Sequence, residues 1–122
     1  MIRIPQHRPD KSLNDIRRFI PFIEALANPL EWEISVEWCS GEGTYEIERS
    51  AETPWRGNHA QFVEIYKGIF QTIDGQFRVQ TDKGGISLIA VDSSYWDIQS
   101  DNDSLEDAFE KEYGRYISPF DG

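Results

Sequence analysis

Residues 31–38 read Glu-Trp-Glu-Ile-Ser-Val-Glu-Trp, so that every second side chain is apolar. Successive side chains of a β-strand point to opposite faces of the sheet, and strict alternation therefore predicts a half-buried strand with one acidic face. The predicted inner face carries Trp32, Ile34, Val36 and Trp38. The turn-forming run at 40–43 and a second alternation at 44–48 predict that this strand returns as a hairpin.

Two further segments downstream predict strands. A nearly continuous apolar run at 86–91 follows the turn Lys83-Gly84-Gly85 and predicts a central strand that is buried on both faces. The chain is then expected to stay extended through residues 95–98.

Residues 58–73 fit two structures. Their apolar spacing suits an amphipathic helix that Asn58 and Gln61 would cap. The segment is also rich in β-branched and aromatic residues, and Asp74-Gly75 is a strong hairpin turn. We favour a strand that ends at Ile73 and pairs with residues 76–81, and we keep the helix as the alternative.

A helix is expected near each end of the chain. Ser12 and Asp15 form a capping-box pattern before apolar residues at spacings of three and four, and Asn28-Pro29 ends that helix. Pro21 should kink or split it, because proline cannot donate to the carbonyl four residues back. Near the C-terminus, Asp103 or Ser104 is expected to cap a second helix.

The C-terminal helix has further sequence signals. Glu106 or Asp107 would complete its capping box, and the inward stripe would be Leu105, Ala108 and Phe109. Gly114 is the expected residue after its end. Together these elements predict an α+β fold, with an antiparallel sheet of four to six strands and helices on one face. We expect a single domain over residues 1–122, with 1–11 as an extended N-terminal arm.

Composition excludes several classes of protein. The chain has 122 residues, with 22 acidic and 12 basic side chains and a net charge of −10, which disfavours binding to the phosphate backbone of nucleic acids. No apolar run is long enough to span a membrane, and no secretory signal is present, so a cytoplasmic protein is expected. The single cysteine, Cys39, excludes an intramolecular disulfide.

The candidate catalytic and metal-binding patterns in the sequence fail on spacing or on charge. The aspartates at 97 and 101 fail as starts of a calcium loop, because position 12 or position 5 would be Ala108 or Leu105. A thiolate–imidazole pair of Cys39 with His59 is disfavoured, since neighbouring glutamates raise the pKa of a thiol.

The glutamate row on the first predicted strand admits a chemical interpretation as well. Glu33 and Glu37 are spaced for a glycosidase pair, but their row is equally typical of a solvated strand face. No phosphate-binding loop is present either. We therefore expect no enzymatic activity, no cofactor and no metal.

The charge is unevenly distributed along the chain. Residues 1–20 hold five basic and two acidic side chains, a balance of +3, whereas residues 92–122 hold two basic and nine acidic ones, a balance of −7. Two aromatic residues, Tyr95 and Trp96, lie among the first acidic residues of this segment. Tryptophan and tyrosine dominate interface hot spots, and carboxylates steer basic partners. The predicted partner-binding residues are Asp92, Tyr95, Trp96, Asp97, Asp101, Asp103, Glu106 and Asp107.

The segment from Asp92 through Tyr95-Trp96-Asp97 to Asp101, followed by a helix, resembles immunity proteins of bacterial toxin systems, of the contact-dependent growth-inhibition or polymorphic-toxin type. The resemblance covers about ten residues. It implies a protein that binds and neutralises a cognate toxin domain, often a basic nuclease. Two alternatives stay open: a phage-type anti-CRISPR or anti-restriction mimic of nucleic acid, and a small enzyme or ligand-binding domain that uses His59 or the glutamate row.

Overall fold

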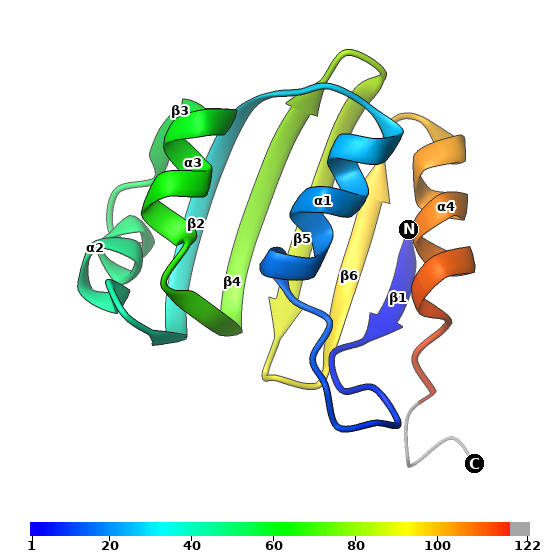
Figure 1. Cartoon of the computed structure of the whole chain (residues 1–122), viewed down its shortest axis with the longest axis horizontal. Coiled ribbons are helices and arrows are strands. Elements are labelled where there is room, and N and C mark those ends of the chain that lie inside the picture. The colour runs from blue at the N-terminus through cyan, green and yellow to red at the C-terminus, as the bar shows by residue number, and fades with distance from the viewer. Residues whose placement is uncertain (118–122) are drawn as a thin grey trace.

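The computed structural model describes residues 1–117, in which six strands form one antiparallel sheet of order β1-β6-β5-β4-β2-β3 (Figure 1). The strands are β1 (Ile2–Pro5), β2 (Pro29–Gly41), β3 (Trp55–Asn58), β4 (Ile69–Thr81), β5 (Gly84–Val91) and β6 (Tyr95–Ser100). The helices are α1 (Ile16–Leu26), α2 (Thr44–Glu48), α3 (His59–Tyr66) and α4 (Asp103–Tyr113), with a 3-10 turn at Arg49–Ala51. The α+β prediction is confirmed.

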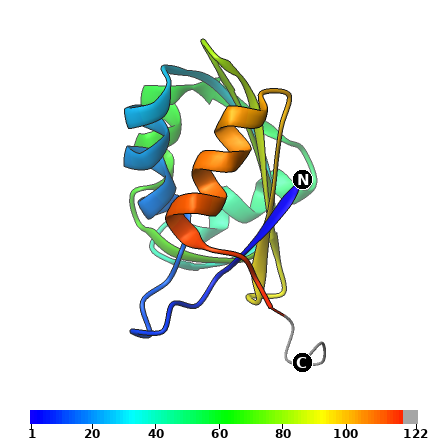
Figure 2. The ribbon, with the colours of Figure 1, turned by 90° about the vertical axis from the view of Figure 1, so that its right-hand side faces the viewer.

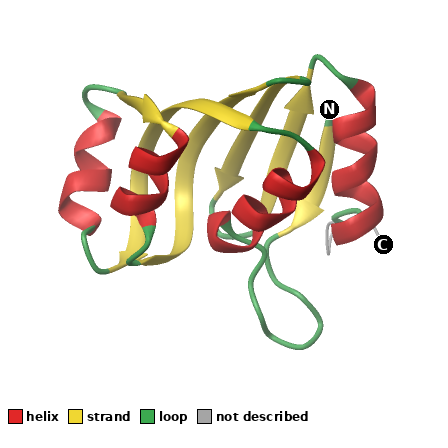
Figure 3. Cartoon of the chain, turned by 45° about the horizontal axis from the view of Figure 1, so that its top comes forward, coloured by secondary structure: helices red, strands yellow, loops and turns green. Residues whose placement is uncertain are grey.

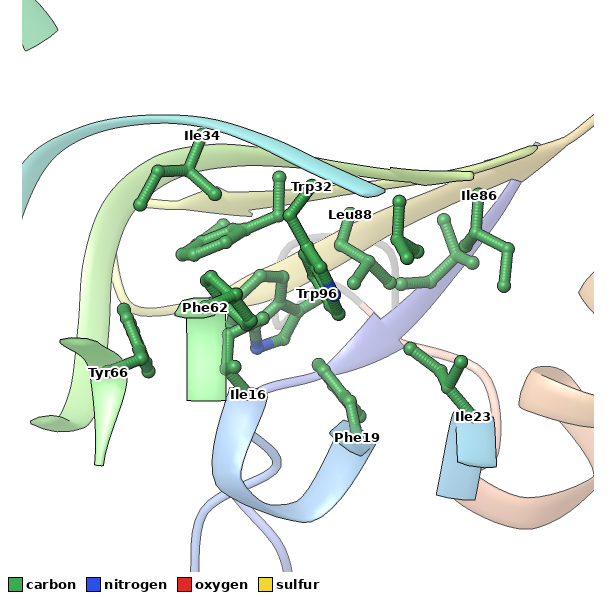
Figure 4. Packing of buried hydrophobic residues seen from close by; sticks show 14 of the residues in the cluster. Ile16, Phe19, Ile23, Trp32, Ile34, Phe62, Tyr66, Ile86, Leu88 and Trp96 are labelled. Carbon is green, nitrogen blue, oxygen red and sulfur yellow. The ribbon is translucent and has the colours of Figure 1, made fainter. Parts of the chain in front are cut away.

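Helices α1, α3 and α4 lie on the same side of the sheet, as the side view shows (Figure 2). The core fills the space between these helices and the sheet (Figure 4). Trp96 packs edge-on against Phe19 of α1, with ring centroids 5.1 Å apart, and also contacts Phe77 of β4. Large side chains such as these each contribute about 1.5–3 kcal/mol when they leave water.

A β-bulge interrupts β2 in its second half. Val36 pairs with Gly75 and Trp38 pairs with Asp74, so Glu37 is an extra residue with no partner in β4. A bulge of this kind shifts the alternation of the strand by one residue. The prediction for Trp32, Ile34 and Val36 is confirmed because they are buried, but that for Trp38 is wrong.

The predicted hairpin at 31–48 is wrong. Residues 44–48 form α2, and the partners of β2 are β3 and β4. Side chains from the α2 region occupy the edge of β2 that a return strand would need. The Ser50 hydroxyl accepts a hydrogen bond from the Val36 amide at 2.8 Å, and the Glu48 carboxylate accepts one from the Cys39 amide at 3.1 Å.

The prediction of a strand at 58–73 is also wrong for the first half of the segment. This half forms a helix, which confirms the alternative. Asn58 and Gln61 form the complete capping box of α3, and β4 starts only at Ile69. Gly75 makes no turn, because it pairs with Val36 and Ala90 in mid-sheet. A side chain at Gly75 would approach atoms of Thr72 and Val36 to 3.1–3.3 Å, so close packing explains the glycine.

The remaining elements agree with expectation, with small shifts. The run at 86–91 lies in a central strand, and 95–98 lies in β6. The prediction that this strand is buried on both faces is wrong, because β5 buries only its alternate residues and none of the described helices covers the second face of the sheet (Figure 2). Asn102, one residue before the expected position, caps α4, and Gly114 ends it. The N-terminal arm includes β1, which pairs with β6.

Helix α1 begins at Ile16, later than its sequence suggested, and runs through Pro21 without a break. The carboxylate of Asp15 caps it by accepting the Ile16 amide at 2.7 Å, and its other oxygen accepts the Thr72 amide of β4 at 2.7 Å. The Thr72 hydroxyl in turn bonds to the Tyr66 hydroxyl. One buried side chain therefore joins α1 to the sheet.

Burial of Asp15 raises its pKa from 3.8 to about 7, against the opposing effect of the amides that it accepts. Between these two values the folded protein binds more protons than the unfolded chain. We therefore expect the contribution of Asp15 to the free energy of unfolding to be full below about pH 4 and to be lost as the pH rises to about 7. Urea unfolding of the wild type and of Asp15→Asn between pH 4 and pH 8 measures this difference.

The matched control for this prediction is Asp10→Asn, because Asp10 is exposed and hydrogen bonds from Ser12 lower its pKa. We expect the stability difference between wild type and Asp15→Asn to shrink across that pH range, and the difference for Asp10→Asn not to shrink. Parallel stability curves for wild type and Asp15→Asn would contradict the assignment.

Candidate interaction surface

Trp96 is not available to a partner. It is 0% exposed, and its indole N–H donates to the carbonyl of Asn14 at 2.9 Å. Its position in β6 directs the side chain toward the helices, where Phe19 and Phe77 enclose it. Its predicted role as a surface anchor is wrong, because alternation along the strand places it in the core.

Tyr95 and Asp97, the neighbours of Trp96, point to the helix-free face and are engaged within the fold. The Arg3 guanidinium forms two hydrogen bonds to the Asp97 carboxylate, at 2.7 and 3.2 Å. The guanidinium carbon Cζ of Arg3 also lies 3.9 Å from the centre of the Tyr95 ring. The positive charge of β1 therefore neutralises this part of β6.

The four acidic residues that follow β6 form a separate group. Glu106 makes an ion pair with the N-terminal amine at 2.9 Å and accepts the Ser100 amide. Asp101 accepts the Gly85 amide at 2.9 Å. Asp103 and Asp107 are exposed near the start of α4, where the helix dipole favours negative charge.

Asp92 lies at the opposite end of β6 from this group. It occupies the tight turn between β5 and β6, where Asp92 and Ser93 both have positive φ, 49° and 50°. The six residues of β6 extend about 20 Å between the two ends. The eight predicted residues are thus divided among the core, the helix-free face and two ends of the molecule, and they form no single acidic face.

The helix-free face of the sheet is balanced in charge. Glu33, from the predicted glutamate row, pairs across strands with Arg56 of β3 and Arg78 of β4, and its carboxylate accepts from the Arg56 guanidinium at 2.7 Å. A hollow of about 530 Å³ crosses this face between Arg56 and Asp101. Because cations flank it on both neighbouring strands, Glu33 contributes no free negative charge to this face.

His59 and Cys39, the two residues considered as a catalytic pair, lie far apart in the structure. His59 lies between Trp32 and Glu24: its Nδ1 accepts the Trp32 indole N–H at 2.9 Å, and its Nε2 donates to Glu24 at 2.9 Å. Cys39 is seven positions along β2 from Trp32, on the order of 23 Å in an extended strand. Burial and the nearby Glu48 carboxylate raise the pKa of its thiol to about 12, which opposes thiolate chemistry.

Residues 1–117 contain no group of three histidine, cysteine, aspartate or glutamate side chains placed to hold a metal ion. Among the described helices, none has the length and apolar character that crossing a membrane requires.

Trp38 is the tryptophan that reaches the surface, with 57% of its side chain exposed. The bulge residue Glu37 precedes it, Asp74 lies opposite it in β4, and Glu48 bonds to the amide of the next residue. The Asp74 carboxylate also accepts the Asp92 amide at 2.9 Å, which brings the β5–β6 turn to the same place. We call these five residues, Glu37, Trp38, Glu48, Asp74 and Asp92, the Trp38 surface.

The Trp38 surface shares Asp92 with the predicted site. Within residues 1–117, none of its four carboxylates forms an ion pair, whereas Asp97 and Glu106 of the predicted site both do. Backbone amides hold Asp74 and Glu48 in place. The surface therefore combines an exposed aromatic ring with negative charge that forms no ion pair within the part of the chain that the structure describes.

A second exposed aromatic residue extends this region. Tyr45, 77% exposed, precedes Glu48 by three residues in α2, a spacing that places both on one side of the helix. Sequence reasoning missed both aromatics, since Trp38 was assigned to the core and Tyr45 to a strand. The bulge has no local sequence signature, and Gly75 opposite it was interpreted as a turn residue.

Comparison with known proteins gives no assignment. No protein-family model, no curated protein and no solved structure matches the chain. The functional argument therefore depends on the geometry described above.

The two tryptophans provide a direct test of these placements. Trp96→Ala should lower the free energy of unfolding by about 3–5 kcal/mol, because it empties a core position. Trp38→Ala should change it by no more than about 0.5 kcal/mol, as is typical at the surface. Urea unfolding of both variants at one pH measures this contrast, and equal losses of stability would contradict it.

Proposed function

We propose that this chain is a binding protein that neutralises a basic protein partner through the Trp38 surface. The observation that carries the proposal is the exposed Trp38 ring beside four carboxylates without ion pairs among the described residues. Tryptophan brings a large apolar area to an interface and loses little conformational freedom on binding. Fixed carboxylates attract a basic partner and set its orientation.

Preorganisation supports the same proposal. Asp74 is held by the amide of Asp92, and Glu48 by that of Cys39, so a partner need not order these groups on binding. Binding loses less free energy when the contacting groups are already ordered. Glu37 and Asp92 are exposed, and exposed charges of this kind act mainly on the rate of association.

The partner class that we propose is a bacterial toxin domain, as the resemblance to immunity proteins suggests, with a basic nuclease as the expected example. A nuclease holds phosphates in a positive groove, and the carboxylates around Trp38 would occupy such a groove. In this proposal the chain is a cytoplasmic inhibitor without enzymatic activity. Exposed Lys11 and Arg17 disfavour the alternative of a nucleic-acid mimic, which would require negative charge throughout.

The experiment that tests the function is capture of the partner with matched baits. Wild type and Trp38→Ala, each immobilised, are incubated with an extract of the source cell and with the purified product of the adjacent upstream gene. We expect the wild type to retain a toxin domain and Trp38→Ala to lose it. Retention of the same domain by both baits would remove the Trp38 surface from the proposal.

Salt dependence gives a second, kinetic prediction. In the double variant Asp74→Asn with Asp92→Asn, the amide oxygens can still accept hydrogen bonds but the charges are absent. Association with the partner should slow severalfold at low salt and much less at high salt, because ions screen exposed charges. Stopped-flow or surface-based binding kinetics at two ionic strengths measures the association rates of the wild type and of the double variant.

The control for the kinetic prediction is the double variant Asp103→Asn with Asp107→Asn, which removes the same charge from α4. We expect its association rate to stay close to that of the wild type at both ionic strengths. A larger effect in α4 than at Asp74 and Asp92 would return the interface to the C-terminal acidic residues.

A further inference from the structure

A third exposed aromatic residue, Phe70 of β4, lies in surroundings of opposite charge to those of Trp38. It is 52% exposed and lines a hollow of about 460 Å³ beside the start of α1. Three cationic side chains, those of Lys11, Arg17 and Arg18, line the same hollow. A chain with a net charge of −10 therefore keeps a local basic concavity around an apolar ring.

Two acidic residues of the chain segment beside this hollow, Asp10 and Asp15, are already engaged in hydrogen bonds. Asp15, which also lines it, is buried, and its two oxygens accept the amides of Ile16 and Thr72. Asp10 accepts the amide of Ser12 at 2.9 Å, within the loop that extends beyond the strand ends between β1 and α1 (Figure 3). These two carboxylates hold the local backbone.

The cationic side chains that line the hollow, by contrast, can still pair with a charged ligand. Within residues 1–117, Lys11, Arg17 and Arg18 form no ion pair. The Arg17 guanidinium donates to the Lys67 carbonyl at 2.9 Å, which orients it and leaves its charge in place. Arginine suits phosphate oxygens because its planar group donates to two of them at once.

The charged residues on the other side of Phe70 favour one orientation of a bound ligand. There the ring and Arg17 border a second hollow, in which three glutamates, Glu42, Glu46 and Glu64, outnumber the two cations, Arg17 and Lys67. The first hollow, with three cations and one buried carboxylate, therefore attracts an anionic group more strongly than the second. Phe70 lies between the two hollows, so a flat apolar group beside the anion would lie on its ring.

Ligand size follows from electrostatics and volume. At physiological ionic strength, charges act over about 8 Å, so a small anion responds to the local cations, whereas an extended polyanion meets the repulsion of the whole acidic chain. A volume of about 460 Å³ is within the range of small-molecule sites. We propose that the hollow formed by Phe70, Lys11, Arg17 and Arg18 binds a nucleotide-sized ligand, with its phosphate on the cations and its base stacked on Phe70.

The test is a binding titration of the full chain, by calorimetry or by amide NMR shifts, with three probes: adenosine monophosphate, inorganic phosphate and adenosine. We expect the monophosphate to bind at least about tenfold more tightly than either fragment, since stacking on one aromatic ring gives an advantage of about that size. Phe70→Ala should reduce its affinity to that of phosphate.

Matched arginine variants complete the design. Arg17→Gln should weaken binding of the monophosphate about tenfold, whereas Arg78→Gln, the same change on the helix-free face, should leave it unchanged. Trp38→Ala should also leave it unchanged, which keeps this site separate from the Trp38 surface. The proposal is overturned if the monophosphate binds no more tightly than phosphate, or if Arg17→Gln behaves like Arg78→Gln.

Discussion

A sheet that is covered by helices on one face only determines the direction of every strand side chain in this protein. Residues that alternate toward α1, α3 and α4 enter the core, and their neighbours point to the open face. Trp96 and Tyr95 are adjacent in sequence, yet the first is fully buried and the second lies under Arg3. Each strand therefore exposes only one of its two sets of alternate residues, and this decides which acidic and aromatic side chains can contact a partner.

The bulge in β2 changes which residues of the strand point outward, and it does so at Trp38. Glu37 has no partner in β4, so Trp38 points outward although the pattern of the preceding residues would place it inside. The same irregular stretch of the β2–β4 pair positions Asp74, which holds the β5–β6 turn. Asp15 fixes Thr72 nearby, so the cap of α1 supports the strand that carries this surface.

The sequence was sufficient where local pattern and tertiary structure agree. Alternation at 31–36, the apolar run at 86–91 and the signals of α4 all predicted their elements. Prediction failed where distant residues decide the outcome. The bulge depends on the register against residues 72–75, and α2 replaces a strand because Ser50 and Glu48 bond to the edge of β2. No local pattern near Trp38 or Tyr45 carries that information.

The most direct test of the central claim is hydrogen–deuterium exchange of the chain with and without its captured partner. The account predicts that binding protects the amides of residues 36–39, 73–75 and 91–94, which form and adjoin the Trp38 surface. Protection confined to residues 101–107, with no change around Trp38, would contradict it.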